Sequence, residues 1–278
     1  MEPIYADRST RGKLRLSGEQ DLWFLHQILT QSFEDMDEGD VRDAALLTAH
    51  GRMVGYLETV RANGSVLVHF EEALSASLPD ALRRYVFATR VEIEDLTDSH
   101  GLVLLVGDGW RDRASSVAPQ AVLHPTRSVG ADAGYLWIER DEAEDVIAAL
   151  EESGCEAASE SDLEALRIDN VMPRWGKDMG PKTIPQEVGL DKWAVHFDKG
   201  CYVGQEAMAK IHFRGKVNRR LARLEGPGLT EGAAVSSGGD EVGTVTSVAE
   251  GRGLAVLKHT IEPGQLVEVD GQEVRVAT

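Results

Sequence analysis

The chain has 278 residues, of which 42% are hydrophobic, and its 29 Lys and Arg against 47 Asp and Glu give a formal net charge of −18 at pH 7. This length can bury a full core and accommodates about two or three domains. The negative charge disfavours general affinity for nucleic acids, because phosphate binding depends on lysine and arginine displacing condensed counterions.

No apolar run approaches the roughly 18 to 20 residues that a membrane helix needs, and the stretch MEPIYADRSTRGK lacks the apolar core of a secretory signal. We therefore expect a cytoplasmic protein that does not enter a membrane. Two cysteines without a secretory signal are expected to be free thiols. The acidic composition would also suit a high-salt cytoplasm.

The first third of the chain predicts a helix followed by a hairpin. Residues 17–33 have apolar residues on one helical face, and Ser17 and Gln20 have the spacing of a capping box. Strands are expected over 43–62 and 64–72, because Asn63-Gly64 is a strong two-residue hairpin signal. A helical pattern over 71–87 should break or restart at Pro79.

Strands are next predicted over 90–97 and 101–107, followed by turns rich in arginine and aspartate and by a strand over 134–140. A helix over 141–154 should end at Gly154, and another over 161–170 should open with a capping box of Ser161 and Glu164. Strands and helices interleave without a regular parallel βαβ repeat. The pattern indicates a multidomain α+β protein.

The C-terminal part, from Leu221 onward, changes to short alternating strands, and Asp270-Gly271 should close a hairpin. This pattern predicts a small all-β barrel or sandwich. Before it, residues 171–193 form a stretch rich in proline and glycine that is too long for an ordinary connection. Long irregular loops in compact chains are often functional.

A basic run stands out against the acidic background, because no acid occurs between Glu206 and Glu225. One interpretation is a patch for a polyanion, such as a polycarboxylate tail or RNA phosphates. The other is a solvated strand face that forms salt bridges with the acidic surface. The cations of this run are Lys210, Arg214, Lys216, Arg219, Arg220 and Arg223.

Just before the basic run lies the segment KGCYVGQE, residues 199–206. Cys201 could act as a nucleophile if the nearby Lys199 favours its thiolate, although most small cysteines are inert packing residues. His196 and His212 flank the segment without the spacing of a zinc site, so we expect no metal. Motifs for dinucleotides, a P-loop or an α/β-hydrolase are missing from the sequence.

KGCYVGQE followed by FRGKVNRRL closely resembles the signature of the YgfZ-type folate-binding proteins, which are relatives of the glycine-cleavage T-protein. Further blocks in family order are DRSTRGKLRLSG, ALLTAHGRM, LRRYVFATRVEIEDL and PRWG through TIPQEVGLD. The resemblance implies two interlocked α+β domains and a C-terminal small β-barrel around a central folate site. It implies a first domain over 1–44 and 129–215, a second over 45–128 and the barrel over 216–278.

The resemblance also locates differences from T-protein. Its catalytic aspartate lies in a block resembling GGxxDD, where this chain has Gly55 and Tyr56, so aminomethyl transfer is disfavoured. Asp169 matches a glutamate of an RxExGxP-like block that contacts the pterin. In the block resembling KxDFIGRE, Cys201 and Gln205 replace an aspartate and an arginine.

The family implies tetrahydrofolate or a one-carbon derivative as the cofactor, in a channel that Cys201 faces. Gly200 and Gly204 would let the backbone pass close to that ligand, and a polyglutamate tail would lie near the start of the basic run. Catalytic candidates are Cys201 and Lys199. Candidates for cofactor binding are Asp169, Trp175, Tyr202, Gln205, Glu206, Lys210, Arg214 and Lys216.

We therefore expect a monomeric, tetrahydrofolate-binding accessory protein that supports the assembly or repair of iron-sulfur proteins and, indirectly, tRNA modification. Its partners would be folate and iron-sulfur client or assembly proteins. A folate-dependent aminomethyl or one-carbon transferase of the T-protein type is the first alternative. An RNA-binding module is the second, which the acidic remainder of the chain disfavours.

Overall fold

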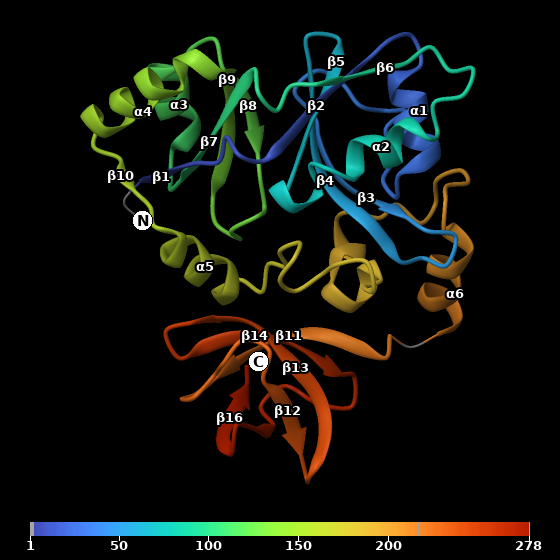
Figure 1. Ribbon diagram of the computed structural model, residues 1–278, viewed down its shortest axis with the longest axis vertical. Helices are drawn as coiled ribbons and strands as arrows, with labels where there is room; N and C mark the ends of the chain where they lie inside the picture. The colour runs from blue at the N-terminus through green and yellow to red at the C-terminus, as the bar shows by residue number, and fades with distance from the viewer. Residues whose placement is uncertain (1–2, 216, 278) are drawn as a thin grey trace.

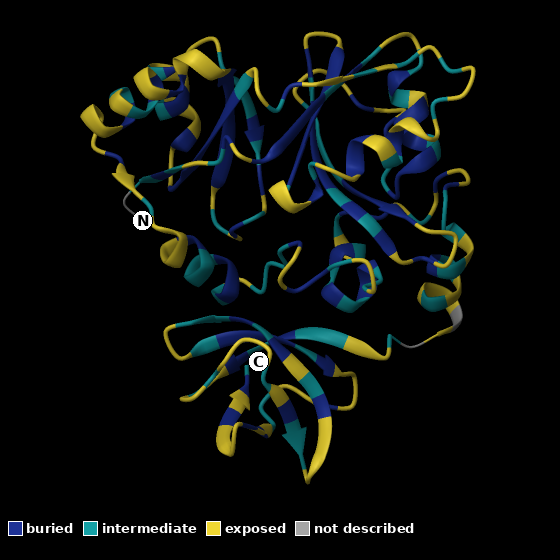
Figure 2. Cartoon of the chain, in the orientation of Figure 1, coloured by how far each residue is buried: buried dark blue, intermediate teal, exposed yellow. Residues whose placement is uncertain are grey.

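The computed structural model describes residues 3–215 and 217–277 and shows three bodies: two five-stranded sheets side by side and a closed barrel beneath them (Figure 1). The strands of the two sheets are largely buried, whereas the outer faces of the helices and the hairpin tips are exposed (Figure 2). Within the described residues, no helix combines the length and apolar character that crossing a membrane requires.

The first sheet is antiparallel throughout, in the order β3-β4-β5-β2-β6. Asn63 and Gly64 both have positive φ, at 53° and 71°, and they close the predicted hairpin between β4 and β5. The elements are β2 (Gly12–Ser17), α1 (Asp21–Ile28), β3 (Val41–Leu47), β4 (Met53–Ala62), β5 (Ser65–Phe70), η1 (Glu72–Leu74), α2 (Leu78–Arg83) and β6 (Glu92–Asp95).

The second sheet has the order β10-β1-β7-β9-β8, and only the β1–β10 pair is parallel. Its first strand precedes every strand of the other sheet in the sequence, so the two α+β units are interlocked. The elements are β1 (Ile4–Asp7), β7 (His100–Val106), α3 (Trp110–Val117), β8 (Val122–Pro125), β9 (Ala133–Glu139), η2 (Arg140–Glu142), α4 (Ala143–Glu152) and β10 (Glu156–Ala157).

The C-terminal strands close into a six-stranded barrel, as predicted, in the order β11-β14-β13-β12-β15-β16. Alternating apolar side chains fill its interior, and closure pairs each of these strands on both sides. Asp270 and Gly271 form the predicted hairpin with φ of 49° and 76°. The strands are β11 (Arg219–Glu225), β12 (Ala234–Ser237), β13 (Asp240–Ala249), β14 (Arg252–Lys258), β15 (Leu266–Val269) and β16 (Gln272–Val276).

The central connection begins with α5 (Glu160–Asp169), continues through η3 (Pro185–Val188) and η4 (Leu190–Lys192), and ends in α6 (Gln205–Arg214). Its irregular part is not a surface loop, because Trp175, Met179 and Leu190 are buried in the core of the first sheet. Helix α5 packs against β13 and β14 of the barrel. The connection therefore joins all three bodies.

Four local predictions were wrong. The strand expected over 43–62 is divided into β3 and β4 by a turn that contains Gly51, with φ of 74°. Helix α1 begins after Gln20 without a side-chain cap, because Ser17 is the last residue of β2. The capping box of α5 is formed by Ser159 and Asp162, two residues before the predicted pair. The turns predicted after β7 contain the helix α3, whose polar sequence WRDRASSV has few apolar residues to indicate a helical face.

The predicted boundaries of the two α+β domains do not coincide with the sheets. The boundary at 44/45 falls inside β3, and the one at 128/129 separates β8 from β9, which pair with each other. The sheets instead take strands from 12–95 and from 4–7 with 100–157. Strand pairing, which joins residues distant in sequence, sets these units. The predicted start of the barrel, residue 216, lies outside the described residues, and the first barrel strand in the sequence is β11.

Candidate functional site

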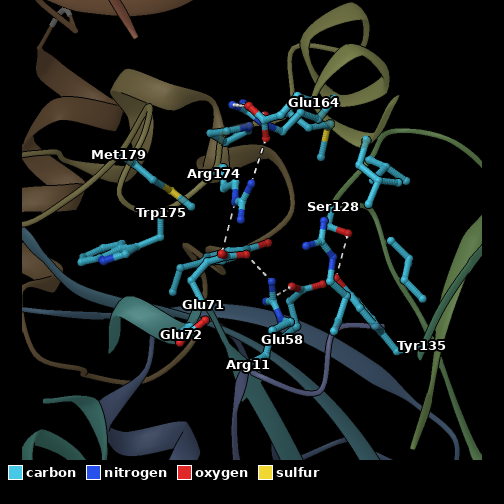
Figure 3. A pocket seen from close by; sticks show the side chains of 18 of the residues that line it. Arg11, Glu58, Glu71, Glu72, Ser128, Tyr135, Glu164, Arg174, Trp175 and Met179 are labelled. Carbon is cyan, nitrogen blue, oxygen red and sulfur yellow. Dashed lines mark hydrogen bonds and ion pairs between the residues drawn. The ribbon is translucent and has the colours of Figure 1, made fainter. Parts of the chain in front are cut away.

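A cavity of about 230 Å³ lies where the two sheets, α5 and the loop after α5 meet. Side chains from β4, β9 and α5 point into it, together with Arg174, Trp175 and Met179 from the loop (Figure 3). Its lining includes four arginines and five glutamates. The pocket is therefore close to neutral and rich in both donors and acceptors.

Arg11 is at the centre of this charged lining. Its Nη2 lies 2.8 Å from Glu58 Oε1, its Nη1 bonds to Glu71, and its Nε donates to His69 Nδ1 at 3.0 Å. Burial opposes the charge of the guanidinium, but Glu71 and Glu58 hold the pKa of Arg11 above its ordinary value. Arg11 therefore stays a fixed cation between two carboxyl groups.

The two carboxyl groups beside Arg11 differ in their pKa. Burial raises the pKa of Glu58 to about 7, against the opposing effect of Arg11. Its Oε2 accepts a hydrogen bond from Thr126 Oγ1 at 2.5 Å. Burial acts on Glu71 in the same direction, but Arg11 and Arg174 together hold the pKa of Glu71 below its ordinary range. Near neutral pH Arg11 thus lies between one partly protonated and one ionised carboxyl group.

The network of ion pairs continues from Glu71 to helix α5 and to the loop that follows it. Arg174 Nε lies 3.2 Å from Glu71 Oε2, and its Nη1 lies 3.0 Å from Glu164 Oε1 on α5. Arg167 also bonds to Glu164, and its Nη1 lies 2.6 Å from Asp178 Oδ2. Cations and anions alternate along this chain, so each buried charge has a partner of opposite sign.

Planar and apolar side chains form the other walls of the pocket. Trp175 lies beside Met179, and Trp193 Nε1 donates to Tyr56 Oη at 3.3 Å. Tyr56 Oη in turn donates to Asp43 Oδ2 at 3.0 Å, which fixes the phenol ring. Flat rings next to paired charges can bind a planar heterocycle by stacking and by hydrogen bonds at its edge.

Strand β4 contains the block that resembles the aspartate-containing block of T-protein. A Cβ on Gly55 would lie 2.7 Å from Leu78, whereas Tyr56 and Glu58 both line the pocket. These two residues are two apart on one strand and so share a face. The position at which the resemblance places an aspartate of T-protein is therefore occupied by Tyr56, which lines the pocket, and Glu58 adds a carboxyl group that the sequence did not indicate.

Asp169, the predicted pterin contact, does not line the pocket. Its Oδ2 lies 3.0 Å from Arg252 Nη1, and Arg223 Nη1 donates to its backbone oxygen at 2.8 Å. Asp169 therefore joins α5 to the barrel. Val171, two residues later, has φ of 54°, a left-handed conformation where the resembling block has glycine. Trp175, by contrast, lines the pocket.

Lys199 of the KGCYVGQE segment is buried beneath α1. Its Nζ donates to the backbone oxygens of Leu29 at 2.7 Å, Gln31 at 2.8 Å and also His26. These oxygens lie at and beyond the C-terminal end of α1, where carbonyls lack helical partners. Burial lowers the pKa of Lys199 to about 7. The three hydrogen bonds of its side-chain nitrogen stabilise the C-terminal end of α1.

The other residues of this segment lie outside the pocket lining. Tyr202 is buried with its ring 5.1 Å from Lys199 Nζ, and Gln205 Nε2 donates to Lys199 O at 3.3 Å. A Cβ on Gly204 would lie 2.6 Å from Thr48 O, so this glycine admits protein backbone. Cys201 is exposed.

The predicted contacts of the basic run lie on the exposed surface of α6 or outside the described residues. Glu206 and Lys210 form an exposed pair at 3.3 Å on α6. Lys216 and the side chain of Arg214 lie outside the described part of the structure. Among the predicted site residues that the structure describes, only Trp175 lines the central pocket.

Comparison with known proteins gives independent information on the family. Residues 218–278 match a family described as the CAF17 C-terminal beta-barrel domain. The chain is 26% identical over 245 residues to the "tRNA-modifying protein YgfZ" of Colwellia psychrerythraea, covering 81% of this chain and 74% of that protein. It is 25% identical over 271 residues to the "Putative transferase At1g60990, chloroplastic" of Arabidopsis thaliana, covering 90% of this chain but only 62% of that longer protein.

The fold has a solved counterpart in the glycine cleavage system aminomethyltransferase T from Bartonella henselae, with a TM-score of 0.87 at 19% identity over 100% of this chain and 85% of that one. An aminomethyltransferase of Thermus thermophilus is 27% identical over 297 residues, covering 98% of this chain and 84% of that protein. The chain is therefore similar in sequence to a YgfZ-type protein and to aminomethyltransferases, it has the aminomethyltransferase fold, and its C-terminal part matches the CAF17 barrel family.

Proposed function

We propose that the central pocket binds a reduced folate, either tetrahydrofolate or a one-carbon derivative. The observation that carries this proposal is the row of carboxylates and guanidinium groups between Trp175 and the tyrosines. A pterin ring is flat and presents amino and N–H donors beside a carbonyl acceptor. Carboxylates accept such paired donors, guanidinium groups donate to the carbonyl, and aromatic rings stack on the ring face.

The bound folate would serve an accessory protein rather than an aminomethyltransferase. Tyr56 stands where T-protein has a carboxylate, and its hydroxyl already bonds to Asp43 and Trp193. The chain would then support the assembly or repair of iron-sulfur proteins and, indirectly, tRNA modification. The name of the YgfZ relative is consistent with the second role. Iron-sulfur client or assembly proteins would be its partners.

Glu58 supports a second candidate, a folate-dependent one-carbon transferase. It is a pocket carboxyl group with a pKa of about 7, suited to holding or releasing a proton. Steady-state formation of methylene-tetrahydrofolate from an aminomethyl donor separates the two candidates. The accessory role predicts no turnover above that of a Glu58→Gln control, and robust turnover by the wild type would contradict it.

Calorimetric titration with tetrahydrofolate under anaerobic conditions tests the binding proposal. Trp175→Ala should weaken binding by about fivefold, since a stacked aromatic wall contributes on the order of 1 kcal/mol. Trp23→Ala is the matched control, because Trp23 is 46% exposed on α1 and does not line the pocket. Absence of binding by the wild type, or an equal loss in both variants, would overturn the proposal.

A further inference from the structure

A second hollow, of about 660 Å³, lies between the barrel and the connection that forms one side of the central pocket. Three cations from distant parts of the sequence line it: Arg52 before β4, Lys182 in the loop and Arg219 on β11. We call it the cationic groove. Trp175 and Met179 of the same loop line the pocket, so one segment contributes to both cavities.

The backbone around the groove is held in place by hydrogen bonds. Arg52 Nη1 donates to the backbone oxygen of Lys182, and the N–H of Met53 donates to Thr183 O at 2.9 Å. These bonds fix the turn before β4 against the loop. Strand β11 packs on η3, which follows the loop directly. The three cations are therefore brought together by tertiary structure, which their sequence positions do not indicate.

The groove is positive although the chain has a formal net charge of −18. Among the described residues that line it, the single acid is Glu187, whose Oε2 accepts from the N–H of Ile184 at 3.0 Å and lies 3.9 Å from Arg52 Nη1. Two cations, Lys182 and Arg219, remain exposed to a ligand. The lining residues Asn218 and Thr244 add a side-chain amide and a hydroxyl.

The side chains that line the groove fit one class of anion better than another. Guanidinium and ammonium groups bind carboxylates through charge-assisted hydrogen bonds. Single-stranded nucleic acid also needs flat rings on which bases stack, and none of the described residues that line the groove is aromatic. We propose that the cationic groove binds a short oligocarboxylate chain, such as γ-linked oligoglutamate.

Two sources present this chemistry: the γ-glutamyl tail of a folate and a separate acidic chain. The first source rests on the proposed function of the central pocket, whereas the second does not. If the folate tail is the occupant, its contacts are Lys182 and Arg219 and not Lys210, the exposed residue on α6 that the sequence predicted. Binding of a peptide without a pterin tests the groove independently of the pocket.

The first experiment is a titration with penta-γ-glutamate at low and at moderate salt. The double variant Lys182→Ala/Arg219→Ala should weaken binding by at least about tenfold, and added salt should weaken binding to the wild type, because the contact is electrostatic. The control Arg83→Ala/Arg84→Ala removes two cations at the C-terminal end of α2, outside the groove, and should change affinity less than about twofold. Thermal unfolding verifies that each variant is folded, and Arg52→Ala provides an independent loss of charge.

The second experiment compares tetrahydrofolate carrying one glutamate with tetrahydrofolate carrying five. If five glutamates bind tighter and the double variant removes only this advantage, the folate tail occupies the groove. If chain length has no effect but the free peptide binds, the occupant is a separate acidic chain. No peptide binding by the wild type, equal loss in the control, or equally tight groove binding of single-stranded RNA of the same charge overturns the proposal. Failure of the monoglutamate alone would contradict the folate pocket instead.

Discussion

The central pocket and the KGCYVGQE segment differ in how the sequence encodes them. The segment is eight consecutive residues with a specific pattern, yet its buried members Lys199 and Tyr202 pack beneath α1 and do not line the pocket. The pocket is assembled from residues as far apart as Arg11 and Arg174, none of which belongs to that pattern. A distinctive sequence motif can therefore consist of residues that pack the core, whereas the residues that line the pocket are distributed along the chain.

The largest effect on stability should come from the charged network. Asp178→Ala removes an acceptor for Thr246, Ser247 and Arg167 and leaves a buried guanidinium with fewer partners. We expect a loss of about 3–5 kcal/mol in the free energy of unfolding, measured with denaturant. Glu206→Ala breaks an exposed pair and should cost less than about 0.5 kcal/mol. Similar losses in both variants would show that the network does not hold the bodies together.

A second variant tests whether Lys199 is structural. Lys199→Ala should lower the free energy of unfolding by about 2–3 kcal/mol, because it leaves three backbone oxygens near the end of α1 without their partner. Lys210→Ala, which removes an exposed ammonium from α6, should cost less than about 0.5 kcal/mol. An unfolding curve of Lys199→Ala that overlays the wild type would restore the catalytic interpretation of this lysine.

Glu58 should make the stability of the protein depend on pH through a group that lines the pocket. Its pKa is raised from 4.5 to about 7 in the folded protein, so folding favours the protonated form. The contribution is fully present below about pH 4.5 and is lost as the pH rises through about 7. Relative to Glu58→Gln, the wild type should lose on the order of 2 kcal/mol across this range.

Denaturant unfolding of wild type and Glu58→Gln at several pH values measures this difference directly. Groups common to both proteins cancel in the comparison. A difference that stays constant between pH 4.5 and 7, or that changes in favour of the wild type, would contradict the raised pKa.

The smallest effect is expected at Cys201, which is exposed and outside the pocket lining. Cys201→Ser should change the free energy of unfolding by less than about 0.5 kcal/mol, since surface substitutions have small effects. Tetrahydrofolate affinity, measured by calorimetry, should stay within about twofold of the wild type. A loss of affinity comparable to that of Trp175→Ala would place Cys201 at the ligand after all.

The predictability of each region follows from the range of the interactions that form it. The barrel strands and their hairpin at Asp270 depend on alternation and turn residues, which are local signals. The capping box of α5 was misassigned because Ser159 and Ser161 both have an acid three residues later. The sheet units could not be delimited, since β1 pairs with strands about 100 and 150 residues away.

The same reasoning applies to the pocket and the groove. Trp175 was identified through the unusual loop and the family resemblance, and it lines the pocket. Glu58 and Arg11 resemble ordinary surface charges in the sequence, because their partners come from other strands. The basic run indicated an excess of cations near α6, but the groove combines one member of that run, Arg219, with Arg52 and Lys182.

The loop at Asp178 has a thermodynamic consequence. The N–H of Arg174 donates to Asp178 Oδ2 at 3.0 Å, and the side chain of Arg174 extends to Glu71 in the pocket. Asp178 also accepts from Thr246 and Ser247 on the barrel strand β13. We therefore expect a ligand that stabilises this arrangement of Arg174 to stabilise the attachment of the barrel, and by reciprocity a partner that binds only the detached barrel should lower the affinity for that ligand by the same factor.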